Sequence, residues 1–183
     1  MSEPRHRYST VSLTLHWLTA LLVVGQIVLI SVAEEVSGSE RGFWMMLHKS
    51  GGATILILTL IRLGWRAANP AIRLPATTPR WQRLAARATH VLFYVLLLAL
   101  PLTGWLAGSA AGRGFEWYGL FDFPLLPIGG GRDLARTLMD VHEALPKLLY
   151  VLLFLHVAGA LKHQFVDRDD VLHRMIPAIP RRP

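Results

Sequence analysis

Four long apolar runs alternate with polar segments along the chain. They cover about residues 11–33, 44–65, 89–107 and 141–165. Each is close to the roughly 20 residues that a helix needs to cross the hydrocarbon core of a bilayer. Because only helices and closed barrels satisfy their backbone in lipid, this pattern predicts an all-α fold. We expect an integral membrane four-helix bundle that forms one domain over residues 1–183.

The arginines are distributed unevenly between the polar segments. Residues 62–87 contain six arginines and no carboxylate, and the prolines in this stretch are expected to interrupt any helix. Cytoplasmic loops of membrane proteins are enriched in Lys and Arg, so we expect this segment and both termini to face the cytoplasm. The tails carry further arginines: Arg5, Arg7, Arg181 and Arg182.

The other two connections are expected on the opposite face of the membrane. Residues 34–43 hold three glutamates and one arginine, and residues 108–140 mix aromatic side chains with charges of both signs. The aromatic residues suggest that part of this long connection lies along the membrane interface. An unstructured loop is the alternative.

The composition supports a membrane protein and narrows its chemistry. Of the 183 residues, 52% are hydrophobic and 17% are charged, which is too apolar for an ordinary soluble domain of this size. The net charge of +7 fits the orientation argument, since the basic residues sit beside apolar runs, and we expect no nucleic-acid partner. The chain has no cysteine, which excludes disulfides and thiolate-bound zinc or iron–sulfur clusters. Redox work would then fall to histidine-ligated metal, haem or an organic cofactor.

The fourth apolar run carries a histidine near each end. His142 and His156 are fourteen residues apart, so in a helix they lie about 40° apart around the axis and roughly 21 Å apart along it. That distance is too long for one shared ion but fits two cofactors stacked across a bilayer of about 30 Å. For either residue alone, the alternative is a buried histidine bonded to its neighbours.

Orientation gives each histidine a depth, and the depths predict two pairs. His48 and His142 begin runs that descend from the outer face, whereas His16 starts near the inner face and His156 lies in the inner half of the fourth run. The predicted pairs are His48 with His142 and His16 with His156. Two axial imidazoles fill both open iron positions of a b-type haem and favour electron transfer over oxygen binding. We therefore expect two haem b groups stacked across the bilayer, with His90 as an alternative to His16.

The remaining histidines and some small residues have weaker predicted roles. His163 lies seven residues beyond His156 on nearly the same face, where it suits a hydrogen bond to a quinone carbonyl. A snorkelling polar residue is the alternative. His6 and His173 lie in polar tails and are expected to be solvated. Glycines near the predicted ligands would admit a macrocycle or mediate helix packing: Gly51, Gly52 and Gly159.

Six short motifs are distributed along nearly the whole chain. They are LHW at 15–17, LHKSGG at 47–52, THVLFYVLLLALPLTGW at 89–105, VHEAL at 141–145, LHVAGALKH at 155–163 and RDDVLHRMIP at 168–177. Together they make the chain similar to the bacterial cytochrome b561 family, small four-helix dihaem cytochromes of the inner membrane.

This resemblance implies an activity as well as a fold. It implies haem iron ligation by His16, His48, His142 and His156, and electron exchange with the quinone pool. At least one member is a superoxide oxidase, which passes electrons from superoxide at the outer face through both haems to ubiquinone near the inner face. In that scheme the histidine matching His163 lies at the quinone. Two features depart from the family. Many relatives have paired histidines where this chain has His163 followed by Gln164, and the basic residue of the connection after the second span has no clear counterpart, with Arg73 and Arg80 as candidates.

The sequence leaves three functional hypotheses. The main one is a multi-pass oxidoreductase of the bacterial inner membrane that carries electrons through two haem b groups, from superoxide at the periplasmic face to ubiquinone. Residues available to attract the anion are Lys49, Arg113, Arg132 and Arg136.

The second hypothesis is a haem b membrane anchor that serves a separate dehydrogenase or hydrogenase and binds a soluble redox partner. The third is a metal transporter that uses histidines as transit ligands. Such pathways usually need acidic residues inside the spans, whereas the carboxylates here lie in connections or at span ends.

Overall fold

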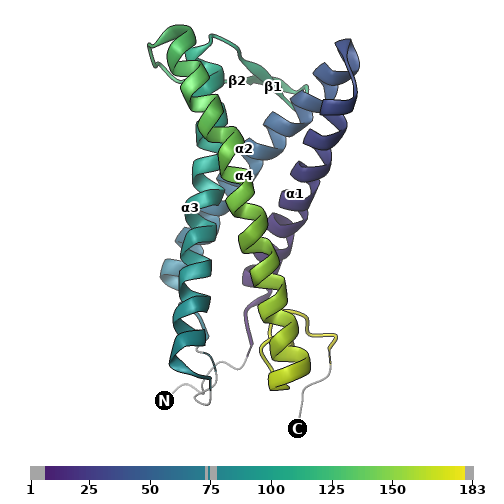
Figure 1. The fold of residues 1–183 in the computed structure, drawn as a ribbon, viewed down its shortest axis with the longest axis vertical. Coiled ribbons are helices and arrows are strands. Elements are labelled where there is room, and N and C mark those ends of the chain that lie inside the picture. The colour runs from purple at the N-terminus through teal and green to yellow at the C-terminus, as the bar shows by residue number, and fades with distance from the viewer. Residues whose placement is uncertain (1–6, 73, 75–77, 180–183) are drawn as a thin grey trace.

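Four long helices make up most of the computed structural model, which describes residues 7–72, 74 and 78–179. The elements, labelled in Figure 1, are α1 (Thr10–Glu35), α2 (Gly38–Ala68), α3 (Arg80–Ala110) and α4 (Gly131–Lys162), with α4 continuing into a π-helical turn, η1 (His163–Asp167). Each of the four helices is long and apolar enough to cross a membrane. The predicted all-α, four-helix membrane fold is confirmed.

The helices extend beyond the apolar runs that predicted them. α1 begins after Ser9, whose hydroxyl accepts a hydrogen bond from the Ser12 amide at 3.3 Å and caps the free backbone donors. α2 starts at Gly38, so the predicted connection over residues 34–43 shrinks to two residues, and α3 starts directly after Pro79. The predicted spans were too short because hydropathy marks the part of a helix that lies in lipid. Backbone hydrogen bonds continue through the polar turns on either side.

The connection between α3 and α4 contains a short β-hairpin. β1 (Phe115–Trp117) pairs antiparallel with β2 (Phe121–Phe123). Tyr118 and Gly119 at the tip have positive φ angles of 52° and 71°, and the amide of Leu120 donates to the Trp117 carbonyl at 3.0 Å. Left-handed backbone at two successive residues and this bond mark a tight turn, with three residues between the paired Trp117 and Phe121. The alternative of an unstructured loop is therefore wrong for this part of the connection.

The hairpin is anchored to α2 mainly by Ser50, and the Tyr118 hydroxyl also lies 3.2 Å from the Thr54 hydroxyl of α2. The Ser50 hydroxyl accepts a hydrogen bond from the Tyr118 amide at 2.9 Å and donates to the Glu116 carbonyl at 3.2 Å. After the hairpin, α4 begins at Gly131, ten residues before the predicted start of the fourth span at residue 141. The irregular part of the connection is thus shorter than the predicted range of 108–140.

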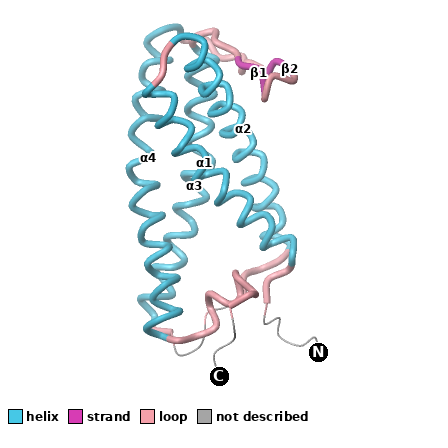
Figure 2. Tube along the Cα trace, turned by 90° about the vertical axis from the view of Figure 1, so that its right-hand side faces the viewer, coloured by secondary structure: helices cyan, strands magenta, loops and turns pink. Residues whose placement is uncertain are grey.

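The helices pack as a bundle whose neighbours follow one another in sequence. Close backbone contacts join α1 to α2, α2 to α3 and α3 to α4, whereas within the described helices α4 makes no such contact with α1 or α2. We call the end where α1 begins and α4 ends the terminal end, and the opposite end, with β1 and β2, the hairpin end (Figures 1 and 2). The buried core draws on all four helices: Val23, Ile55, Leu96, Leu97, Leu149 and Leu152.

The segment after η1 folds back against the start of α1. The Trp17 indole donates to the Met175 carbonyl at 2.9 Å, and the Arg7 guanidinium donates to His173 Nε2 at 3.1 Å. His173 Nδ1 also bonds the Ile179 carbonyl, and the residue is only 5% exposed. The prediction that His173 is solvated is therefore wrong, because these protein groups replace water around both ring nitrogens. His6 lies outside the described residues.

Candidate functional site

Each helix contributes one residue to each of two levels of the bundle. The two residues of a helix are always fourteen positions apart, which brings them to about the same face and separates them by roughly 21 Å. We call the two sets the hairpin-end level and the terminal-end level. The first contains Ile30, His48, Gly104 and His142; the second contains His16, Arg62, His90 and His156.

At the hairpin-end level, two imidazoles face each other across the bundle. The ring centres of His48 from α2 and His142 from α4 are 6.2 Å apart, and the ring planes lie at 83° to each other. Two metal–nitrogen bonds of about 2.0 Å, plus about 1.1 Å from each nitrogen to its ring centre, also give about 6.2 Å. The structure thus brings this predicted pair together at the separation that one iron between them requires.

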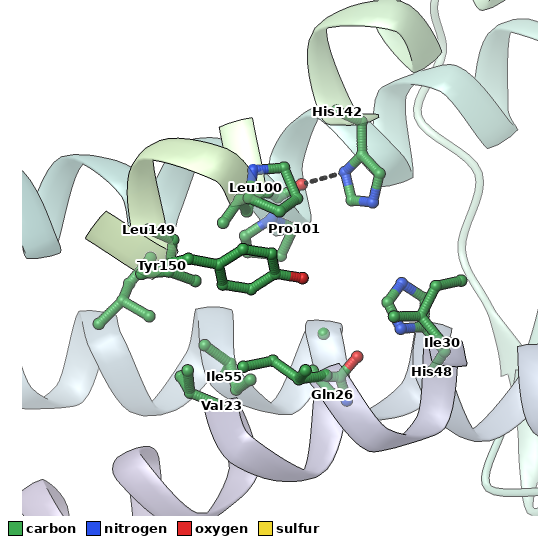
Figure 3. A pocket seen from close by; sticks show the side chains of 14 residues that line it. Val23, Gln26, Ile30, His48, Ile55, Leu100, Pro101, His142, Leu149 and Tyr150 are labelled. Carbon is green, nitrogen blue, oxygen red and sulfur yellow. Dashed lines mark hydrogen bonds between the residues drawn. The ribbon is translucent and has the colours of Figure 1, made fainter. Parts of the chain in front are cut away.

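A cavity lined by side chains of all four helices has both rings in its wall. In Figure 3 the two imidazoles face each other at one end of the group of side chains that line this cavity. Aliphatic side chains from all four helices make up much of its lining: Val23, Ile27, Ile30, Ile55, Leu97, Leu100 and Leu149. The lining also includes Gly52 and the side chains of Gln26 and Tyr150. A mostly apolar cavity with a few placed polar groups is typical of a cofactor site.

Backbone and glycine contacts from α3 orient the His142 ring. Its Nδ1 donates to the Leu100 carbonyl at 2.9 Å (Figure 3). The Thr103 hydroxyl lies 3.3 Å from the same nitrogen. The bond to Leu100 fixes the proton on Nδ1 and leaves Nε2 free to bind a metal. A Cβ added at Gly104 would lie 3.0 Å from His142 Cε1, so only glycine leaves the ring its present space. On the facing ring, His48 Nδ1 is buried without a hydrogen-bond partner.

At the terminal-end level, three histidines come together. The ring centres of His16 and His156 are 6.3 Å apart, and those of His90 and His156 are 5.6 Å apart. The first distance is again the one expected for two imidazoles on one iron, and the second is shorter. The structure therefore favours His16 over His90 as the partner of His156.

The terminal-end level differs from the hairpin-end level in containing an arginine, Arg62. Its guanidinium donates to His16 Nδ1 at 3.1 Å and lies 5.7 Å from the centre of the Tyr94 ring. Sequence reasoning did not single out Arg62 or Gly104. The fourteen-residue spacing that connects His142 with His156 would have identified both, since it also connects His48 with Arg62 and His90 with Gly104.

The three glycines predicted near the ligands have different surroundings. Gly52 lines the hairpin-end cavity. Gly51 is buried, and a Cβ added there would overlap the Gln26 amide of α1, so this residue permits the close packing of two helices. A Cβ added at Gly159 would meet no atom within 4 Å. Only Gly52 is thus placed to make room for a cofactor.

His163 lies in η1 and is part of a polar network. Its Nδ1 is 2.7 Å from Asp169 Oδ2 and 3.5 Å from Asp167 Oδ2. The Lys162 ammonium binds both carboxylate oxygens of Asp167 at 2.6 Å. Although these side chains could in principle surround a cation, the ammonium already occupies the Asp167 carboxylate. We interpret the group as an ion-pair network that orients the imidazole, and π-helical turns of this kind are frequent at functional sites.

The four basic residues predicted to attract superoxide lie at the hairpin end. Lys49 is half-buried, with its Nζ 6.0 Å from the centre of the Phe115 ring, and Arg113 is close enough to act on it electrostatically. Arg132 and Arg136 are exposed on the first turns of α4. Of these four residues, Lys49 and Arg113 are therefore the pair that concentrates positive charge at one place.

Comparisons with known proteins agree with this arrangement. A family model described as "Prokaryotic cytochrome b561" matches residues 7–178. The chain is 35% identical over 187 residues to "Cytochrome b561 homolog 2" of Escherichia coli strain K12, covering 93% of this chain and 91% of that protein. It is 31% identical over 176 residues to "Probable superoxide oxidase CybB" of Yersinia pestis, covering 93% and 96%. It is also 28% identical over 177 residues to "Cytochrome b562" of Cereibacter sphaeroides, covering 92% and 94%.

Proposed function

Because the chain belongs to the prokaryotic cytochrome b561 family, we propose that it oxidises superoxide at one membrane face and reduces ubiquinone near the other, through two haem b groups. Family membership and the four spanning helices make it a multi-pass cytochrome of the bacterial inner membrane that binds b-type haem and transfers electrons across the bilayer. The number of haems, their ligands, the donor and the acceptor are the parts that we propose.

One observation carries the dihaem proposal. α4 presents His142 and His156 at two levels, and each faces a histidine of another helix, at 6.2 Å and 6.3 Å between ring centres. At the hairpin end these rings also border an apolar cavity, and His142 keeps Nε2 free. We propose that His48 with His142, and His16 with His156, would hold the iron of the two haem b groups. Bound haem supplies one-electron redox chemistry.

The donor reaction is proposed at the hairpin end, which we assign to the periplasm. Two superoxide anions each lose one electron and leave as dioxygen. The positive charge of Lys49 and Arg113 would raise the local concentration of the anion beside the hairpin-end level. The name of the Yersinia pestis relative supports this donor.

The acceptor reaction is proposed at the terminal end, on the cytoplasmic side. There, two electrons and two protons convert one ubiquinone into ubiquinol. His163 would bind a quinone carbonyl through Nε2, because its Nδ1 is held by Asp169 at 2.7 Å. When this ring is protonated, the carboxylate balances its charge, and Nε2 can donate to the quinone.

The test uses purified full-length protein in lipid nanodiscs that contain ubiquinone. We expect two haems per chain and ubiquinol formation when superoxide is generated in the buffer. Superoxide dismutase should abolish the reaction, and Lys49→Gln should slow it most at low ionic strength. Intact haem spectra without any superoxide-dependent ubiquinol would contradict the proposed donor.

A second candidate function is a haem b anchor for a separate dehydrogenase or hydrogenase. Its support is the tip of the hairpin, where Leu120 is 72% exposed and Phe121 is 53% exposed, so an apolar surface is available to a partner protein. Copurification of a stoichiometric soluble subunit from native membranes would favour this role. A Leu120→Ser, Phe121→Ser double variant should then release that subunit.

A further inference from the structure

The terminal-end level contains positive charge that the described protein residues do not neutralise. Arg62 and Arg66 are four residues apart on α2 and half-buried. Their guanidinium groups lie against the rings of Tyr94 and Tyr8, at 5.7 Å and 5.9 Å from the ring centres. No carboxylate of the described residues forms an ion pair with either group. Like charges at this spacing repel, and a guanidinium removed from water needs an anionic partner.

The bond between Arg62 and His16 determines which nitrogen of the imidazole carries the proton. A guanidinium can only donate, so the contact of 3.1 Å makes His16 Nδ1 an acceptor. A neutral imidazole then carries its proton on Nε2, the nitrogen that would have to bind iron. This is the reverse of His142, whose Nδ1 donates to a carbonyl. Iron ligation by His16 Nε2 therefore requires Arg62 to exchange this acceptor for another one.

We propose that Arg62 anchors a propionate of the haem at the terminal-end level, with Arg66 stabilising the same negative charge. This inference rests on the proposed function, since it requires a haem b at that level. The propionate is the acceptor that arrives together with the iron, and a guanidinium pairs with a carboxylate through two parallel hydrogen bonds. The exchange also releases His16 Nδ1, so cofactor binding and the tautomer of the ligand are coupled. The hairpin-end level has a glycine and an isoleucine among its four residues and no arginine.

Redox titration of Arg62→Gln tests whether the positive charge of Arg62 acts on the terminal-end haem. A nearby cation favours the added electron, so the variant should lower the midpoint potential of the terminal-end haem and leave the hairpin-end haem unchanged. The terminal-end haem is identified as the one that His156→Ala removes. Arg87→Gln is the matched control. It removes an exposed arginine of α3 at the terminal end of the bundle and should leave both midpoint potentials unchanged. Wild-type potentials in Arg62→Gln, or an equal shift of both haems, would overturn the proposal.

Reconstitution with modified haem tests the contact itself. Full-length apoprotein of the wild type and of Arg62→Gln is titrated with haem b and with haem dimethyl ester, whose propionates carry no charge. Esterification should weaken wild-type binding at the terminal-end level by about tenfold or more, and should change the binding of Arg62→Gln far less. Equal losses in the two proteins would show that Arg62 and the propionate act independently.

Two further outcomes keep the inferences separate. Fewer than two haems in the wild type would overturn the dihaem proposal itself. Two wild-type haems with unaffected Arg62 variants would overturn only the anchor. If Arg62→Gln yields no folded protein, Arg62→Lys replaces it. Lysine keeps the charge but not the paired hydrogen bonds, so a smaller downward shift of the same haem is expected, and an unchanged potential would count against the anchor.

Discussion

At the hairpin-end level, two facing histidines are surrounded by aliphatic side chains and a glycine, whereas at the terminal-end level the corresponding pair is joined by a third histidine and a guanidinium. The ring separations are nevertheless almost equal, 6.2 Å and 6.3 Å. The distance between imidazoles is thus a property of the helix framework, and the local charge is a property of the residues that α2 and α3 add. A cation stabilises a reduced haem most when it is close. Arg62 contacts His16 directly, whereas Lys49 and Arg113 only flank the hairpin-end level, so we expect electrons to move favourably from the hairpin end to the terminal end.

The largest expected effect is the loss of one haem without the other. His142→Ala should remove the hairpin-end haem and leave the other, so that haem content falls from two per chain to one. His156→Ala should give the converse result. Haem quantitation and reduced-minus-oxidised spectra measure both variants, and His163→Gln, outside both levels, should keep two haems. Loss of both haems from a His142→Ala protein that is still folded would contradict independent sites.

The hairpin-end level can be perturbed without removing a ligand. Gly104→Ala places a Cβ about 3.0 Å from His142 Cε1, so the ring must shift from its bond to Leu100. Overpacking of this kind costs roughly 1–3 kcal/mol, and we expect a corresponding loss of haem affinity at this level alone. Gly64→Ala, where an added Cβ meets no atom within 4 Å, is the control for titration of apoprotein with haem. Equal affinities in the two variants would show that the glycine is dispensable.

The terminal end carries a proposed quinone contact that the hairpin end lacks. Asp169→Asn removes the charged partner of His163 at 2.7 Å. By analogy with outer partners of metal ligands, we expect KM for ubiquinone to rise about tenfold, with kcat less affected and haem content unchanged. Asp167→Asn should have a smaller effect, because that carboxylate is bound by Lys162 and lies 3.5 Å from the ring. A larger change in the control variant would reverse the assigned roles.

The smallest effect is expected at the third histidine. His90→Ala should leave the terminal-end haem six-coordinate, because His16 has the longer ring separation that iron requires, 6.3 Å against 5.6 Å. Electron paramagnetic resonance of the oxidised protein should remain low-spin, with only a small shift of the midpoint potential. His16→Ala should lose that spectrum. The opposite pattern would make His90 the ligand.

Hydropathy and helix geometry predicted much of this molecule. Apolar length identified the four spans, and the positions of His16, His48, His142 and His156 predicted which rings meet. The structure brings both pairs together, while iron ligation by them stays a prediction. These features depend only on how deep each residue lies in the membrane. That depth follows from its position in the span and the constant rise per residue of a helix.

The features that sequence reasoning missed depend on contacts between helices. Gly104 is important because of its rotational position toward α4, and Arg62 because of its position toward α1. A span assignment contains neither rotation, although the fourteen-residue spacing from His48 and from His90 points to both positions. The hairpin at 115–123 and the buried ring of His173 were missed for a related reason, since polar segments fold against neighbours that are distant in sequence.

The separation between α4 and the first two helices has a consequence for the stability of the protein in the cell. Without close backbone contact there, these parts are joined through α3 and through core side chains such as Val23, Ile55 and Leu149, and haem bonded to imidazoles of both parts would add a further link. A newly inserted chain would then remain loosely assembled until it received its pigment. Under iron starvation we therefore expect the polypeptide itself to be degraded by membrane proteases, so that its abundance follows haem supply rather than transcription.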